Sequence, residues 1–489
     1  MSQNQRPNIL FALADDASHF GVYGHDFVRT PNIDRIATEG VIFENAFTTN
    51  PKCAPSRASI LTGRYTWQNE EACNHFCYFP DKFNLLPDVL DDHGYFTGYT
   101  GKGWKPGDYK RSGLKRNPAG NEYNEFELTP PENTRIWSVD YAKNFEHFLS
   151  QKPDDMPFYF WYGASEPHRP YSFGEGIRAG KALRDIDKVP PYWPDCDEVR
   201  IDMVDYAYEI EWFDAQLGRM ISKLDEIGEL DNTLVVVTSD NGCSFPRVKG
   251  QMYEQDFHLP MVAQWKAKTK NGGRRIKDLV SFTDIAPTFL EAAGIPPCST
   301  MTGRSFFDVF TTDKQGQIHP DRTVTYFGRE KHDIGRENDV GYPVRCIRDH
   351  KYLYIRNFEP DRWPAGNPET GYTNCDYSPT KRKVLELNEQ GVPYYYNLAF
   401  AKRPLEELYD IQEDPECLNN LALKAEYDEL KRSMWKQLEG FLIETKDPRL
   451  TISPDYFDKM ETILDGTSAS WKAYEEGRWE LAHFCRFDW

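Results

Sequence analysis

Three short apolar runs, each ending in polar residues, constrain the fold of this chain more than any other feature. They cover Asn8–Ala14, 158–162 and 234–239, and each has the length and apolar character of a strand buried on both faces. A long amphipathic helix, predicted over 204–227, separates the second run from the third. Buried strands that alternate with helices predict an α/β domain with a largely parallel sheet.

The polar residues after these runs should meet at one edge of that sheet, where the carboxyl ends of parallel strands lie together and ligands bind. Asp15 and Asp16 follow the first run, His168 lies just beyond the second, and Asp240 and Asn241 follow the third. Carboxylate and amide oxygens suit a hard cation such as Ca²⁺ or Mg²⁺ rather than zinc. Each pair taken alone also fits a turn or a helix cap.

The character of the sequence changes near Gly341, which predicts a second, smaller unit. We predict two domains, 1–340 and 341–489, the second an α+β domain. Its expected elements are two short strands within 343–357, a strand over 407–410 and a long helix over 421–445. A strand over 324–327 is expected to be the last one of the large sheet.

Composition excludes several classes of partner. The chain has 489 residues, with 58 Lys and Arg against 77 Asp and Glu, which gives a net charge of −19. This charge argues against nucleic acid and anionic membranes, and an anionic ligand would need a local cluster of cations. No apolar run approaches the roughly 20 residues of a membrane span. The polar N-terminus predicts a cytoplasmic protein, or a periplasmic or secreted one from which a leader was removed. The ten cysteines show no zinc-ligand spacing, and most are read as reduced thiols.

The most specific motif is C-A-P-S-R, from Cys53 to Arg57, continued by L-T-G-R at 61–64. A buried structural cysteine would be the ordinary explanation of Cys53 alone. With the acids at 15–16, Gly-Lys at 101–102 and Ser-Asp-Asn-Gly at 239–242, however, the chain resembles the type I sulfatases over nearly its full length. The resemblance implies an alkaline-phosphatase-like α/β sandwich. Its large, mostly parallel central sheet would be flanked by helices and joined by a small C-terminal α+β domain with a short antiparallel sheet.

The resemblance also implies how Cys53 would be used. In this family a maturation enzyme oxidises the cysteine to formylglycine, an aldehyde that hydrates to a geminal diol. One hydroxyl attacks sulfur, and the other later expels sulfate. Ca²⁺, ahead of Mg²⁺, would be bound by Asp15, Asp16, Asp240 and Asn241, with position 53 as a further ligand.

Four cationic side chains match catalytic positions of the family. Arg57 would support the formylglycine, Lys102 and Lys249 would bind the sulfate, and His168 would protonate the leaving group. For Lys102 an ordinary surface lysine, and for His168 a structural histidine, is the alternative. The chain departs from the common G-K-x-H pattern, because Trp104 stands at the histidine position. His258 stands where many sulfatases have arginine. Either His19 or His258 replaces the missing base, or turnover is slower.

Shorter motifs resemble the heparan N-sulfatase (N-sulfoglucosamine sulfohydrolase) group within the family. They lie at 68–69, 74–76, 166–169, 189–194, 240–246, 342–345 and 444–448. The resemblance places substrate contacts at Asn74, His75, Arg169, His332 and Arg345, although ordinary polar residues would explain each of them equally well. Trp67 and Trp104 could stack on a sugar ring or belong to the core.

Together these features predict an exo-acting carbohydrate sulfatase that cleaves sulfate esters or sulfamates, with N-sulfoglucosamine the first compound to test. The predicted partners are a sulfated mono- or oligosaccharide and the maturation enzyme, with no nucleic acid and no membrane; a homo-oligomer stays open. One alternative is a phosphonate or phosphate monoester hydrolase of the same superfamily. Another is a sulfated-glycan binding protein with an unmodified Cys53.

Overall fold

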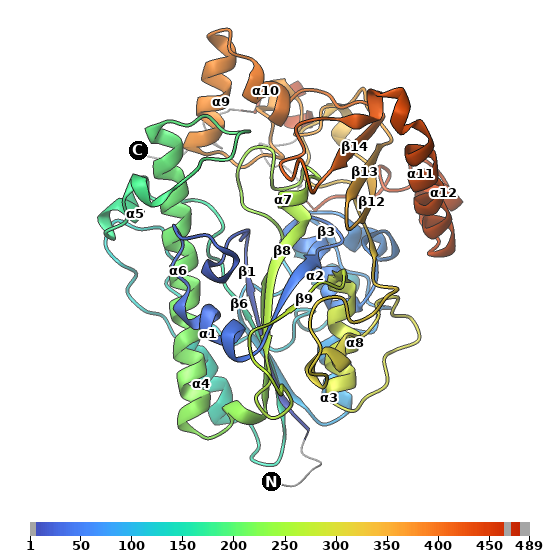
Figure 1. Ribbon diagram of the computed structural model, residues 1–489. Coiled ribbons are helices and arrows are strands. Elements are labelled where there is room, and N and C mark those ends of the chain that lie inside the picture. The colour runs from blue at the N-terminus through green and yellow to red at the C-terminus, as the bar shows by residue number, and fades with distance from the viewer. Residues whose placement is uncertain (1–5, 464–470, 480–489) are drawn as a thin grey trace.

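The computed structural model describes residues 6–463 and 471–479 (Figure 1). An eight-stranded sheet forms the centre of the large domain, with the order β10-β2-β8-β7-β1-β6-β4 and with β9 beside β2. Its strands are β1 (Asn8–Ala14), β2 (Val41–Phe47), β4 (Phe96–Gly101), β6 (Phe158–Gly163), β7 (Thr233–Ser239), β8 (His258–Gln264), β9 (Arg274–Ile276) and β10 (Val280–Ser281). β1 pairs in parallel with both β6 and β7, and β4 pairs in parallel with β6. The prediction of a mostly parallel sheet is confirmed; the exception is β8, which runs antiparallel to β7 and β2.

Alternate side chains of β1 enter two apolar cores, one on each face of the sheet. Ile9, Phe11 and Leu13 pack with helices α2 (Cys53–Thr62), α3 (Leu86–Asp92) and α8 (Ile285–Ala292). The intervening β1 residues pack with α1 (Pro31–Glu39), α4 (Tyr141–Gln151) and α6 (Asp197–Glu226) on the other face. Figure 1 shows these two helix layers on opposite sides of the sheet. Burial on both faces is what the continuous apolar runs of the sequence predicted.

A four-stranded antiparallel sheet forms the core of the C-terminal region, in the order β11-β12-β13-β14. Its strands are β11 (Val324–Arg329), β12 (Val344–Asp349), β13 (Tyr352–Asn357) and β14 (Glu406–Asp410). The helices of this region are α9 (Pro379–Glu389), α10 (Tyr394–Ala399), α11 (Asp428–Glu444), α12 (Pro448–Thr451) and α13 (Trp471–Glu475). Other short elements are α5 (Glu175–Arg178), α7 (Glu254–Phe257) and a two-stranded sheet of β3 (Cys77–Tyr78) and β5 (Gly107–Asp108), in addition to short 3₁₀ helices.

One strand prediction is wrong. The segment 324–327 does not extend the large sheet, because it lies in β11 and pairs antiparallel with β12 from Val324–Asp349 to Arg329–Val344. Its first residues alternate between half-buried and buried. That alternation is typical of an antiparallel sheet rather than of a strand buried on both faces. β11 therefore lies before residue 340 yet pairs with a strand after it; the division at 340 itself stays a prediction.

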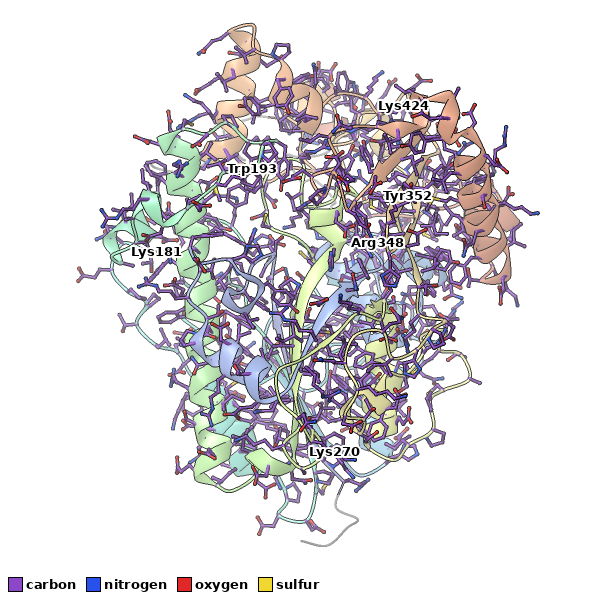
Figure 2. All side chains as sticks on the ribbon, viewed as in Figure 1. Lys181, Trp193, Lys270, Arg348, Tyr352 and Lys424 are labelled. Carbon is purple, nitrogen blue, oxygen red and sulfur yellow. The ribbon has the colours of Figure 1, made fainter. Side chains whose placement is uncertain are left out.

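The two sheets share an apolar cluster and a buried ion pair. Phe47 and Phe257 from the large domain pack with Phe327 and Leu353 of the second sheet. Arg348 of β12 lies beside α7 (Figure 2), with Nη2 2.7 Å from Oε1 of Glu254. In the described part of the chain no helix has the length and apolar character to cross a membrane. The nine cysteines in that part are free.

Candidate active site

The carboxyl ends of β1 and β7 bring three acidic side chains together. Ala14 pairs with Ser239, so the residues that follow each strand lie side by side. The Asp16 backbone N–H donates to Oδ1 of Asp240 at 3.1 Å. Carboxylate oxygens of Asp15, Asp16 and Asp240 all lie within 4.8 Å of one another, and all three residues are buried. Residues far apart in sequence thus form one acidic cluster, as the strand pattern predicted.

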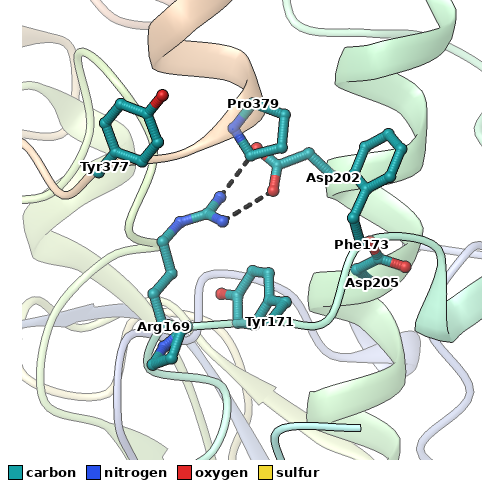
Figure 3. Close-up of a pocket in the computed structure, with 8 residues that line it drawn as sticks. Arg169, Tyr171, Phe173, Asp202, Asp205, Tyr377 and Pro379 are labelled. Carbon is teal, nitrogen blue, oxygen red and sulfur yellow. Dashed lines mark hydrogen bonds and ion pairs between the residues drawn. The ribbon is translucent and has the colours of Figure 1, made fainter. Parts of the chain in front are cut away.

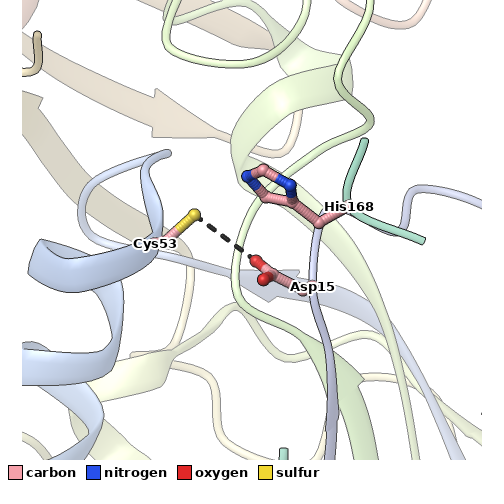
Figure 4. A group of neighbouring side chains, drawn as sticks. All are labelled: Asp15, Cys53 and His168. Carbon is pink, nitrogen blue, oxygen red and sulfur yellow. Dashed lines mark hydrogen bonds between the residues drawn. The ribbon is translucent and has the colours of Figure 1, made fainter. Parts of the chain in front are cut away.

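Cys53 faces this cluster from the first residue of α2. Its Sγ lies 3.4 Å from Oδ1 of Asp15 and 3.9 Å from Oδ1 of Asp16. Ligand atoms of His168 also lie within 4.8 Å of those of Asp15 and Cys53. Figure 4 shows the three side chains converging from separate segments of the fold. The thiol of Cys53 therefore lies against the acidic cluster.

Three cations surround the acids. Arg57, one turn after Cys53 on α2, donates from Nε to Oδ2 of Asp240 at 2.8 Å. Lys102, just after β4, pairs with Oδ2 of Asp15. Nζ of Lys249 lies 2.7 Å from Oδ2 of Asp16. The structure therefore brings the three predicted acidic ligands together with Cys53, His168 and the three predicted cations.

The charges of these groups shift one another's pKa values. Burial alone would raise the pKa of Asp15, but Lys102 and then Arg57 hold that pKa well below its usual range. Burial and the Asp15 carboxylate raise the pKa of Asp240 to about 7. Burial and the same carboxylate raise the pKa of the Cys53 thiol well above its usual value. Burial and the Lys249 ammonium lower the pKa of His168. The pKa of Asp240 is raised because burial and the Asp15 carboxylate together outweigh the charges of Arg57 and Lys102.

The donor set fits a hard cation. Oδ1 of Asn241 is buried and has no hydrogen-bond partner in the described part of the chain, while Nδ2 of the same side chain donates to Oδ1 of Asp16 at 2.7 Å. A buried acceptor without a donor is costly, and a cation beside it would remove that cost. Three carboxylates and one amide oxygen are ligands that Ca²⁺ and Mg²⁺ prefer. The residues present therefore fit the metal that the sequence analysis predicted.

Two of the predicted substrate residues lie in a network that begins next to Cys53. Nδ1 of His75 is 2.7 Å from Oδ1 of Asp333, whose other oxygen is 2.8 Å from Nζ of Lys52. Nε2 of His332 contacts Oδ1 of Asn50 at 2.6 Å. The opposite ring nitrogens, Nε2 of His75 and Nδ1 of His332, are buried and have no hydrogen-bond partner among the residues that the structure describes. Each of these two histidines thus contacts the protein through one ring nitrogen and has a buried second nitrogen.

The other predicted substrate residues are occupied by protein groups. Asn74 accepts from the backbone N–H of Lys331 through Oδ1 at 2.9 Å. Arg169 forms a bidentate pair with Asp202, at 2.7 and 2.9 Å, in the wall of a small pocket (Figure 3). Arg345 is fully buried and pairs with Glu330 and Asp447, each at 2.7 Å. The structure therefore does not bring Arg345 to the cluster around Cys53.

Both tryptophans considered as sugar platforms are fully buried. Nε1 of Trp104 donates to the backbone oxygen of Ala54 at 3.0 Å, and its ring packs edge-on against Phe79. Nε1 of Trp67 donates to Oγ1 of Thr445 at 3.0 Å. Of the two alternatives given for these rings, the structure supports the core position, because a fully buried ring cannot meet a ligand.

The two histidines considered as a replacement base bind other groups. His258 contacts Oε1 of Glu254 through Nδ1 at 2.9 Å and the Glu44 oxygen through Nε2 at 2.7 Å, so both ring nitrogens are occupied. Nδ1 of His19 lies 3.0 Å from the hydroxyl of Tyr206. Burial, and then the neighbouring His25, lower the pKa of His19 well below its usual value.

Sequence reasoning missed three charged residues that border the cluster: Lys52, Asp333 and Asp376. Nζ of Lys249 lies 3.0 Å from Oδ2 of Asp376 as well as contacting Asp16. Lys52 directly precedes Cys53, which was a usable signal. Asp333 and Asp376 lie in loops without a motif, and only the fold brings them near residue 53.

Comparison with known proteins agrees with this geometry. Residues 7–295 match the family model described as Sulfatase, and residues 248–364 match the model described as N-sulphoglucosamine sulphohydrolase, C-terminal. The chain is 29% identical to human N-sulphoglucosamine sulphohydrolase over 484 residues, covering 90% of this chain and 91% of the relative. It is 28% identical to an ulvan-active sulfatase of Formosa agariphila over 475 residues, covering 91% and 76%.

A solved structure has the same fold, with a TM-score of 0.66 at 21% identity, covering 92% of this chain and all of the other. That protein was solved in complex with its substrate, D-glucosamine-2-N,6-O-disulfate. The match to the Sulfatase model spans more than half of the sequence. With the acidic cluster, Cys53 and the surrounding cations already in place, we conclude that this chain belongs to the sulfatase family.

Proposed function

We propose that this protein hydrolyses sulfate esters or sulfamates of sugars and releases inorganic sulfate at the cluster around Cys53. The observation that carries the proposal is the convergence of Cys53 with the acids Asp15 and Asp16 and the cations Lys102 and Lys249. A sulfuryl group carries negative charge that grows during transfer. Fixed cations in a buried site stabilise that charge without reorganisation.

Cys53 itself is a poor nucleophile as a thiol. Its raised pKa keeps it protonated near neutral pH, whereas cysteine reacts as the thiolate. We therefore propose that Cys53 is oxidised to formylglycine, whose hydrate would supply the attacking hydroxyl. Cys53 is only 1% exposed in the folded protein. The maturation enzyme must therefore act before the chain has finished folding.

Ca²⁺ is the metal we propose, bound by Asp15, Asp16, Asp240, Asn241 and the modified residue 53. When bound, it would polarise the sulfate oxygens and offset the charge of the three carboxylates. Arg57 supports this arrangement in two ways. It pairs with Asp240, and its Nη1 donates to the backbone oxygens of Lys102 and Gly103, which fixes the segment that carries the Lys102 ammonium.

The remaining roles follow from position and exposure. Lys102 and Lys249 bind the sulfate oxygens from two sides. The side chain of His168 is 35% exposed, and its Nε2 lies 4.0 Å from Oδ2 of Asp16, so the ring borders both the cluster and the solvent. We propose that the imidazolium form of His168 donates a proton from Nε2 to the bridging oxygen or nitrogen as its bond to sulfur breaks. Because burial and Lys249 lower the pKa of His168, acidic pH should favour this form. The sugar then leaves as a neutral alcohol or amine.

N-sulfoglucosamine is the substrate we propose to test first. The support is the match over 90% of the chain to human N-sulphoglucosamine sulphohydrolase and the match of residues 248–364 to its C-terminal model. The disulfated glucosamine bound by the solved relative belongs to the same class of compound. The test is sulfate release from N-sulfoglucosamine, glucosamine 6-sulfate and 4-nitrophenyl sulfate by protein made together with a maturation enzyme.

Peptide mass spectrometry decides whether the sample bears the aldehyde. Cys53→Ala is the matched control, and we expect it to fold and to release no sulfate. Hydrolysis of aryl phosphate with none of any sulfate would favour the phosphomonoesterase alternative. An exclusively thiol Cys53 in protein from its own host, with glycan binding and no turnover, would favour the binding protein.

A further inference from the structure

Asp376 is a charged residue of the site to which the proposed mechanism gives no role. It lies in the irregular segment between β13 and α9. Nζ of Lys249 lies between two carboxylates, 2.7 Å from Oδ2 of Asp16 and 3.0 Å from Oδ2 of Asp376. The Asp16 side chain is fully buried, whereas that of Asp376 is 26% exposed. Of the two carboxylates that contact Lys249, that of Asp376 is therefore the more exposed.

The segment around Asp376 does not depend on this carboxylate for its shape. Nζ of Lys381 donates to the backbone oxygens of Gly371, Tyr372 and Cys375, at 2.8 to 3.1 Å. Oγ1 of Thr380 donates to Asp202 at 2.6 Å. Within the described residues, Lys249 is the one ion-pair partner of the Asp376 side chain. A neutral residue at position 376 should therefore leave the loop folded.

The charge of Asp376 acts on the same space as the sulfate-binding cations. The groups whose charge it experiences most are Lys249, Lys52 and His168; Lys52 directly precedes Cys53, and Lys249 and His168 contact the acidic cluster. Burial would raise the pKa of Asp376, but these cations hold it well below its usual range, so the carboxylate is ionised at neutral pH. An anion bound near Lys249 is attracted by the lysine and repelled by Asp376.

That repulsion grows with the charge of the ligand, because Coulomb energy is proportional to it. A sulfate monoester or a sulfamate carries a single negative charge. A phosphate monoester carries about −1.5 to −2 near pH 7. We propose that Asp376 is a specificity-determining residue that makes this site prefer singly charged sulfuryl groups over phosphate monoesters. The inference rests on the proposed function and deepens it.

The test compares kcat/KM for three substrates with the same leaving group and no sugar hydroxyls. They are 4-nitrophenyl sulfate, 4-nitrophenyl phosphate and 4-nitrophenyl phenylphosphonate, the last a singly charged phosphorus ester. All are measured on formylglycine-bearing, Ca²⁺-loaded protein. Asp376→Asn should lower the sulfate-to-phosphate ratio about tenfold or more, since removing one close charge is worth at least that at an effective dielectric constant of about 20. The sulfate-to-phosphonate ratio should stay within about twofold.

Two further variants keep the test decisive. Asp376→Glu retains the charge and should keep the wild-type ratios. Asp376→Ser removes the charge by a different side chain, so a folding defect in the Asn variant alone does not decide the outcome. If the phosphate ester is not turned over, its inhibition constant against 4-nitrophenyl sulfate replaces kcat/KM and should fall by the same factor.

The inference is overturned if folded Asn and Ser variants keep the wild-type sulfate-to-phosphate ratio. It is also overturned if they lose activity on all three substrates equally, because that would mean a structural role. Neither result would contradict the proposed function, which is the hydrolysis of sulfate esters or sulfamates. That function fails separately if wild-type protein bearing the aldehyde releases no sulfate from any substrate.

Discussion

His168 and Arg169 are neighbours in the sequence but have different surroundings in the structure. Proline precedes and follows the His168-Arg169 pair in the sequence, and the structure directs His168 and Arg169 to different places. The histidine borders the cluster around Cys53, whereas the arginine forms a bidentate ion pair with Asp202. Adjacent residues in a loop point apart, so closeness in sequence does not imply a shared role. His168 is therefore the residue on which a catalytic prediction can be tested.

We expect His168→Ala to impair substrates in proportion to the basicity of their leaving group. Loss of a general acid should cost about 10²–10⁴-fold in kcat/KM where the leaving amine or alcohol needs a proton. With 4-nitrophenyl sulfate the loss should be much smaller, because nitrophenolate leaves without one. Kinetics of the variant on N-sulfoglucosamine and on the aryl ester check this. Equal losses on both substrates would contradict the assignment of His168 as the acid.

At the scale of elements, α2 is the helix that presents Cys53, and it is buried along its whole length. Its first turn is held from outside by the indole of Trp104, which donates to the Ala54 oxygen. Trp104 therefore supports the start of the helix that carries Cys53. In the sequence, the departure from G-K-x-H indicates that a catalytic histidine is missing. In the structure, residue 104 packs in the core instead.

Trp104→His, which restores the common family pattern, should therefore destabilise the protein rather than improve it. Removing most of a fully buried indole leaves a cavity, and large-to-small substitutions of this kind cost about 3 kcal/mol in free energy of unfolding. Urea unfolding and kcat/KM measure the two effects. If the variant unfolded like wild type and turned over substrate faster, the packing role of Trp104 would be contradicted, and a histidine at position 104 would be catalytic. Trp67→His, another buried tryptophan, serves as the packing control.

The ion pair between α7 and β12 is a second feature at this scale, and it makes stability depend on pH. Burial would raise the pKa of Glu254, but Arg348 and His258 lower it to about 2 from an ordinary 4.5. A depressed folded-state pKa adds stability above the unfolded value, and that stability is lost as pH falls from about 4.5 towards 2. A difference of about 2.5 in pKa corresponds to at most roughly 3 kcal/mol in the free energy of unfolding.

Glu254→Gln should therefore be less stable than wild type at neutral pH, with the difference shrinking in acid. Unfolding by urea at about pH 7 and about pH 3 measures it. Lys459→Gln, which removes a charge from an exposed pair with Asp455, provides the control with little expected change. A Glu254→Gln deficit that stays constant between the two pH values would show that the carboxylate is not coupled to Arg348 as described.

At the scale of the whole molecule, the proposed cation joins segments that are more than two hundred residues apart. Removing it with EDTA should abolish sulfate release and lower the melting temperature, since a ligand bound only by the folded state stabilises that state. At a free Ca²⁺ concentration about 100 times Kd, the effect is about 2.7 kcal/mol. Thermal melts with EDTA, Ca²⁺ and Mg²⁺ check this. Full activity of protein shown by elemental analysis to be metal-free would remove the metal role, and bound zinc would contradict the oxygen-donor argument.

The sequence by itself determined the parts of this protein that depend on local pattern. Continuous apolar runs specified β1, β6 and β7, because only strands buried on both faces need them. The polar residues after those strands specified the acidic cluster, since parallel strands end at one edge. The motif from Cys53 to Arg57 specified the family. These features can be predicted from the sequence alone, because each depends on periodicity, on strand direction or on a contiguous motif.

Only the tertiary structure decided which residues meet across long distances. The segment 324–327 could not be assigned to its sheet from its own residues, because its partner β12 lies some twenty residues further on. Trp104 and Arg345 look like site residues in the sequence, yet packing and buried ion pairs occupy them. Asp376 shows the reverse: no motif marks it, and only the fold of the C-terminal segment brings its charge beside Lys249. Such contacts depend on how loops close over distance, which a local pattern does not encode.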